Sequence, residues 1–98
     1  MVLTIDSSLT PAGYEYLDLS DGNVKGLNPP NGAIAALIGW RFGEIHWRDD
    51  AAPAPGDATI GQLLPEDGFI WYKRELTAIK FIGIGPPQRG VSVSYYSP

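Results

Sequence analysis

The one histidine of the chain, His46, stands shortly before a pair of carboxylates, Asp49 and Asp50. Imidazole and carboxylate groups close together are the donor set of many metal sites and of general acid–base catalysis. A calcium loop, however, alternates its acidic ligands and has a glycine at its sixth position, and the run Asp49–Pro53 has neither feature. We therefore interpret His46 as a surface residue of a strand. The two aspartates are interpreted as turn residues, and we expect Asp49 or Asp50 to accept backbone N–H groups in the loop Ala51–Asp57.

The remaining catalytic patterns in the sequence are incomplete. Gly83–Gly85 begins like a dinucleotide fingerprint, but two prolines follow where a helix should begin, so no helix N-terminus would hold a phosphate. No Gly-x-Ser-x-Gly elbow occurs, and a single histidine leaves a serine triad with one candidate base. Glu44, Glu66 and Glu75 could pair as glycosidase carboxylates, but a domain of 98 residues has little room for the necessary cleft. The sequence predicts no catalytic residue, metal site or cofactor, with a small hydrolase around His46 as a minor alternative.

The composition excludes several classes of partner. Eleven Asp and Glu against seven Lys and Arg give a formal net charge of −4 and a pI near 4.6. The cations stand at Lys25, Arg41, Arg48, Lys73, Arg74, Lys80 and Arg89. Because they form no cluster along the sequence, we predict no nucleic-acid surface. The absence of cysteine excludes disulfides and thiolate ligands, and neither a signal sequence nor an apolar run of membrane-spanning length is found, so we predict no membrane contact.

Twelve glycines and nine prolines divide the chain into short segments, a spacing that favours strands. Apolar and polar residues alternate in Glu44–Arg48 and in Val91–Tyr96, and Ile79 and Phe81 flank a lysine in the same way. This is the pattern of antiparallel strands with one face in the core and the other in water. Ala33–Ile38 is apolar on both faces, so it is either a central strand or a short buried helix. Its flanking glycines favour a strand.

These segments predict an all-β fold, a compact antiparallel β-sandwich or barrel of six to eight short strands. The expected strands are Tyr14–Leu19, Ala33–Ile38, Glu44–Arg48, Thr59–Leu64, Phe69–Lys73, Thr77–Ile82 and Val91–Tyr96. Pro65–Asp67 and Arg74–Leu76 are each expected to form at most a single helical turn. We assign residues 13–98 to a single sandwich domain. Residues 1–12 are interpreted as an extended N-terminal arm, because this segment has neither periodicity nor a glycine turn.

Aromatic side chains are numerous for a chain of this length. The alternation predicts a core that contains Ile45, Trp47, Trp71, Ile79, Phe81 and Val93. Four further rings are the candidates for an exposed interface: Tyr14, Tyr16, Trp40 and Tyr96. Sugar-binding modules display such rings, but exposed rings serve protein interfaces at least as often as ligand sites.

An ordered series of short motifs runs through the second half of the chain. It comprises His46-Trp47-Arg48-Asp49-Asp50, a Pro/Ala loop, Ala58–Leu64, Gly68–Tyr72, Leu76–Ile82 and Val91–Tyr96. This series resembles small virion proteins of tailed bacteriophages, in which the pattern reads RWRDDG, P-A, G-L-L, L-W-Y, L-A-AI-R-FI and L-N-V-S-YY. The resemblance covers about half of the chain. Ala51 stands where glycine is usual, the loop Gly83–Gly90 carries two prolines, and the first forty residues take no part in the resemblance.

The resemblance implies a non-enzymatic β-sandwich component of the virion. Among such proteins are capsid decoration or cement proteins, which bind the outside of the major capsid protein shell and stabilise it. A small chain of this kind is expected to form a homo-oligomer, a trimer or a dimer. The arm at residues 1–12 would then add a strand to the edge of a neighbour's sheet. The alternative is a receptor- or carbohydrate-binding module, or another tail or head–tail component of the particle.

Overall fold

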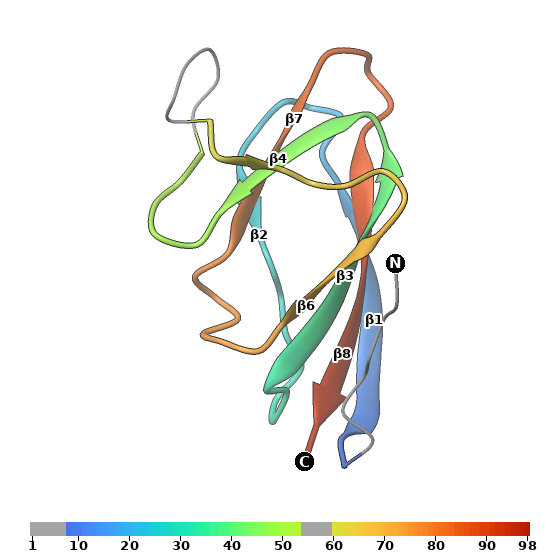
Figure 1. Ribbon diagram of the computed structural model, residues 1–98, viewed down its shortest axis with the longest axis vertical. Coiled ribbons are helices and arrows are strands. Elements are labelled where there is room, and N and C mark those ends of the chain that lie inside the picture. The colour runs from blue at the N-terminus through green and yellow to red at the C-terminus, as the bar shows by residue number, and fades with distance from the viewer. Residues whose placement is uncertain (1–7, 54–59) are drawn as a thin grey trace.

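In a computed structural model, which describes residues 8–53 and 60–98, two antiparallel four-stranded sheets pack face to face (Figure 1). The strands are β1 (Thr10–Asp18), β2 (Lys25–Gly26), β3 (Ala35–Phe42), β4 (Glu44–Arg48), β5 (Gln62–Leu63), β6 (Phe69–Tyr72), β7 (Lys80–Ile84) and β8 (Gly90–Ser97). One sheet has the order β1-β8-β3-β6 and the other β2-β7-β4-β5. The predicted all-β sandwich is confirmed, and the sheets do not close into a barrel. The described residues contain no helix that could span a membrane.

The alternating segments form strands as predicted. Glu44–Arg48 is β4, and Val91–Tyr96 lies within β8. Most of Ala33–Ile38, the segment with two possible readings, lies in β3, where β8 and β6 pair with it on either side. The strand is central in its sheet, but its outer face is only partly covered, since Leu37 on that face is half-buried.

Neither of the two segments in which a single helical turn was possible forms one. Residues 66–67 and 76–78 form turns, with no helical residue in either segment. The Ala78 N–H donates to the Glu75 carbonyl at 3.0 Å, a single i to i+3 bond. Strand β7 begins two residues later, at Lys80, so the chain has no length in which to build a helix.

The folded domain begins earlier than predicted. β1 starts at Thr10, which pairs with Ser97, and Pro11 pairs with Tyr96. Residues 10–12, expected to belong to a separate arm, are thus part of the domain's own sheet. The rest of the expected arm, residues 1–7, lies outside the described residues.

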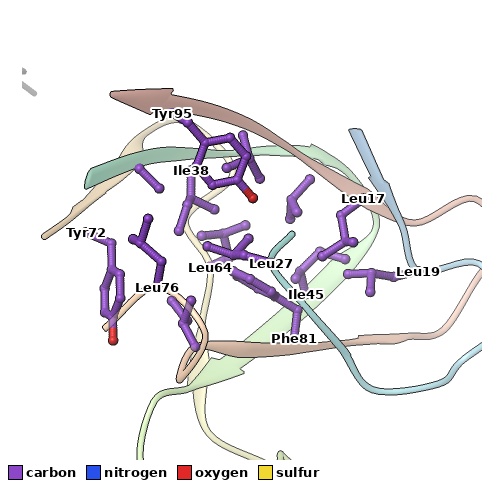
Figure 2. Packing of buried hydrophobic residues seen from close by; sticks show 14 residues of the cluster. Leu17, Leu19, Leu27, Ile38, Ile45, Leu64, Tyr72, Leu76, Phe81 and Tyr95 are labelled. Atoms are coloured by element: carbon purple, nitrogen blue, oxygen red, sulfur yellow. The ribbon is translucent and has the colours of Figure 1, made fainter. Parts of the chain in front are cut away.

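The core fills the space between the two sheets, and Figure 2 shows it from close by. Its buried members are Leu17, Leu19, Leu27, Ala36, Ile38, Ile45, Leu64, Tyr72, Leu76, Ile79, Phe81, Val91, Val93 and Tyr95. Four of the six predicted core residues belong to this set, and Trp47 packs against it while partly exposed. Trp71 does not belong to it. Because Tyr72 is buried and Ile70 packs on the core, the alternation along β6 turns Trp71 to the outer face.

Two polar clusters join the loops to the sheets. The Arg89 guanidinium donates to the Gly83 carbonyl at 2.9 Å and to the Ser20 carbonyl at 2.5 Å, so it ties the loop before β8 to the loop after β1. Glu15 accepts the hydroxyl proton of Tyr95, and it also accepts the backbone N–H of Asn28 at 2.9 Å. The second cluster fixes the β2–β3 loop against β1.

Candidate functional site

Two rows of uncharged residues cross the outer face of the sheet β1-β8-β3-β6. One row consists of Tyr14, Ser94, Leu37 and Trp71, and the next of Tyr16, Ser92, Gly39 and Phe69. Tyr96 follows Ser94 on the same face of β8 by the alternation of the strand. We call the large side chains of this surface the aromatic face: Tyr14, Tyr16, Leu37, Phe69, Trp71 and Tyr96.

The aromatic face is open to solvent. Tyr14 is 65% exposed, Phe69 46% and Tyr16 41%, which places all three among the most exposed large hydrophobic residues of the described chain. Trp71 and Tyr96 are half-buried and pack edge to face, with ring centroids 5.3 Å apart. Clustered apolar rings on a monomer surface mark interaction sites far more often than scattered ones do.

Two glycines let rings of the aromatic face lie close to the backbone. A Cβ atom on Gly39 would stand 2.7 Å from Cε1 of Phe69, so the Phe69 ring occupies the space above this glycine. Gly90 is covered in the same way by the phenol of Tyr16. Because a side chain at either position would displace a ring, the glycines allow the rings of Phe69 and Tyr16 to lie directly on the sheet.

A pair of opposite charges stands at one end of the aromatic face. Asp18 on β1 and Arg41 on β3 lie there beside a shallow hollow of about 440 Å³, which is lined by Tyr14, Tyr16, Asp18, Ser20, Arg41, Phe42 and Gln88. Hydrogen bonds from Ser20 lower the pKa of Asp18, so this carboxylate stays ionised. Burial, and then the charge of Asp18, raise the pKa of Tyr16. The hollow therefore presents one anion, one cation and two neutral phenols.

Three of the four predicted interface residues lie on one surface. Tyr14, Tyr16 and Tyr96 all belong to the aromatic face. Trp40 does not, because it pairs with Val91 and so shares the inward side of that buried valine. Its ring packs against the core, and its indole N–H donates to the Gly43 carbonyl. Trp40 is therefore turned toward the core, apart from the other three rings.

The sequence did not point to three members of the aromatic face. Leu37, Phe69 and Trp71 stand in segments that are apolar at consecutive positions, where alternation is a poor guide to the outer side. Trp71 was for this reason wrongly predicted to lie in the core. Only the pairing of β3 with β8 and β6 shows that the three residues line up with Tyr14 and Tyr16.

The residues first considered for chemistry lie elsewhere, around β4. His46 Nε2 is 2.7 Å from a carboxylate oxygen of Glu44, and Nδ1 of His46 is buried without a hydrogen-bond partner. The Arg48 guanidinium binds both carboxylate oxygens of Asp50 at 2.9 Å, and these bonds are the main cause of a lowered Asp50 pKa. Asp49 accepts the Tyr72 hydroxyl at 3.3 Å.

Among the described residues, the principal donors to the two aspartates are the side chains of Arg48 and Tyr72. The predicted bonds from the loop backbone stay a prediction. Residues 54–59 of that loop lie outside the described part of the chain. Within residues 8–53 and 60–98, no group of three or more His, Asp or Glu side chains is arranged to hold a metal ion.

Comparison with known proteins yields no relative. No protein-family model matches the chain, and no curated protein or solved structure matches it either.

Proposed function

We propose that the protein is a non-enzymatic structural protein of a virus particle, a capsid decoration protein that attaches to the major capsid protein shell through the aromatic face. The observation that carries the proposal is the pair of uncharged rows across the sheet β1-β8-β3-β6. The cores of protein interfaces are depleted in charged residues and enriched in Tyr, Trp and Phe. Such rings also supply most of the binding energy when they are fully covered.

The motif series in the sequence supports a capsid shell as the partner. Two of its motifs, Gly68–Tyr72 and Val91–Tyr96, contain Phe69, Trp71 and Tyr96. The residues that carry the resemblance to phage virion proteins are thus in part the residues of the aromatic face.

Repetition makes a small face sufficient for a decoration protein. A standard interface buries about 800 Å² on each partner, and a shell offers many equivalent sites. When an oligomer engages several of these sites at once, its overall affinity exceeds that of one copy by orders of magnitude.

The test is co-sedimentation of the purified protein with shells that lack it. Phe69→Ser and Tyr14→Ser should each weaken binding by roughly 10- to 100-fold, because a buried aromatic side chain contributes about 1.5–3 kcal/mol. Leu63→Ser is the matched control, since Leu63 is 60% exposed but lies on β5 of the other sheet. Equal weakening by Leu63→Ser would contradict the assignment of the face. Failure of the intact protein to bind any shell would contradict the proposal that it is a decoration protein.

A second candidate function, carbohydrate binding, is favoured by the hollow beside Asp18 and Arg41. Two tyrosine rings with a carboxylate, a guanidinium and an amide can stack on a sugar ring and bond its hydroxyls. Arg41 has no hydrogen-bond partner within the described chain and only lies over the Phe42 ring at 5.1 Å. Glycan binding that Arg41→Ala abolishes, in the absence of shell binding, would establish this candidate instead.

A further inference from the structure

Strand β1 is an unusually long sheet edge in this fold. It has nine residues and pairs with β8 alone, at the side of its sheet. The other edge strands of the described chain are short, with four residues in β6 and two each in β2 and β5. Long edges offer unpaired backbone groups to another strand unless they are protected. Pro11 and the irregularity before Gly13 protect the first part of β1, whereas Tyr14–Asp18 keeps an unbroken register.

One hydrogen bond establishes which backbone groups of β1 face outward. The Leu19 N–H donates to the Arg89 carbonyl at 2.9 Å, one step beyond the Asp18–Gly90 pair. In an antiparallel ladder, hydrogen-bonded pairs alternate with non-bonded ones, so Leu17 and Glu15 also direct their backbone groups toward β8. The N–H and C=O groups of Tyr14 and Tyr16 therefore point away from the sheet. By the same alternation the Asp18 carbonyl points away from β8, and it accepts a hydrogen bond from Lys25 Nζ on β2 at 2.7 Å.

The four outward groups of Tyr14 and Tyr16 have no hydrogen-bond partner among the described residues. The same groups on a second copy of the chain are complementary to them. When two copies of β1 run antiparallel, Tyr14 of each copy stands opposite Tyr16 of the other. Each such pair exchanges two bonds, so all four groups of both strands are satisfied.

The centre of such a pairing brings the two Glu15 residues opposite each other. Their side chains point to the core side of the sheet, where each carboxylate accepts the backbone N–H and the side-chain amide of Asn28, at 2.9 and 3.2 Å, and the hydroxyl of Tyr95. Each Glu15 is thus held by its own domain, and its charge is spread over three donors. Repulsion between the two is reduced accordingly.

We propose that two copies of this chain form a dimer by antiparallel pairing of their β1 strands across Tyr14 and Tyr16. The dimer has a continuous eight-stranded sheet, and the aromatic faces of the two copies form one surface. The pairing rests on the backbone edge and not on the proposed shell attachment. The dimer would, however, carry two aromatic faces, so it could engage two sites of a shell at once.

The test is the mass of the free protein by sedimentation equilibrium. Wild type should rise from 10.6 kDa toward twice that value as its concentration increases. Tyr16→Pro removes an outward N–H while leaving the ladder to β8 intact, because proline is tolerated on a strand edge that faces solvent. It should stay monomeric with a near-native circular dichroism spectrum. Tyr16→Ser keeps the N–H and removes the ring, so it should still dimerise.

Hydrogen exchange of the wild type gives a second readout that needs no variant. The amides of Tyr14 and Tyr16 should become protected as concentration rises, whereas the amide of the exposed loop residue Asn31 should not. A wild type that remains at 10.6 kDa at millimolar concentration would overturn the proposal. A dimer whose Tyr14 and Tyr16 amides stay unprotected, or one that Tyr16→Ser dissociates, would overturn it as well. Shell binding is measured separately, so the two proposals fail independently.

Discussion

Removal of one buried hydroxyl, by Tyr95→Phe, should destabilise the domain in a pH-dependent way. Tyr95 is 2% exposed, and its hydroxyl donates to Glu15. At pH 7 the variant loses a hydrogen bond to a charged acceptor, which is worth about 1.5–3 kcal/mol. Glu15 keeps its two bonds from Asn28, so we expect the lower end of this range.

The same hydroxyl makes the wild type sensitive to alkali. Burial, and then the hydrogen bond to Glu15, raise the pKa of Tyr95 above the value of about 10 found in unfolded chains. Above pH 10 the folded state therefore holds this proton more tightly than the unfolded state does. The free energy of unfolding must fall as pH rises, by up to about 1.4 kcal/mol per pH unit for one group. The stability difference between wild type and Tyr95→Phe should thus shrink from pH 7 to pH 11.

Urea unfolding at pH 7, 10 and 11 measures this difference. All other titrating groups are common to both proteins, so their effects cancel in the comparison. Tyr14→Phe is the matched control, because Tyr14 is 65% exposed and its loss should change stability little at any pH. A difference between wild type and Tyr95→Phe that is the same at pH 7 and pH 11 would refute the role of the Tyr95–Glu15 bond.

Two further substitutions test the packing and the loop ties. Phe81 has no exposed surface, so Phe81→Ala should lower the free energy of unfolding in urea by about 3–5 kcal/mol. Trp47→Ala should cost clearly less, since Trp47 only packs on the margin of the core. The reverse order would contradict this assignment of the core. Arg89→Met should cost about 2 kcal/mol, because the carbonyls of Gly83 on β7 and of Ser20 in the loop after β1 lose their donors. Hydrogen exchange should also quicken at the Leu19 amide. An unchanged melting temperature would show that the guanidinium does not hold the loop after β1 in place.

Where polar and apolar residues alternate, the sequence predicted both the strand and its orientation. Glu44–Arg48 and Val91–Tyr96 are strands with the expected inward residues, because only one side of each pattern can be buried. Phe69–Tyr72 is apolar throughout, so the strand was predicted correctly, whereas the prediction that Trp71 is buried was wrong. The neighbouring strand decided which face is buried, and Trp71 came to lie outside.

The candidate site was only partly predictable for the same reason. Tyr14 and Tyr16 were correctly predicted to be exposed, but Glu15 shares the opposite face with Leu17, so alternation alone did not decide which face of β1 is buried. Trp40 follows a long apolar run in which either side could face the core, and its pairing with Val91 turned it inward. The alignment of residues from β1, β3 and β6 into rows depends on sheet order, which joins segments far apart in the chain and leaves no local signal.

Hydroxyl-radical footprinting of the protein, free and bound to shells, tests the central claim that the aromatic face is the attachment surface. Tyr14 and Phe69 are open to oxidation in the free protein, at 65% and 46% exposure, and so is Leu63 at 60%. We predict that binding strongly reduces oxidation of Tyr14 and Phe69 and leaves Leu63 unchanged. Protection of Leu63 with undiminished oxidation of Tyr14 and Phe69 would contradict the claim and assign attachment to the opposite sheet.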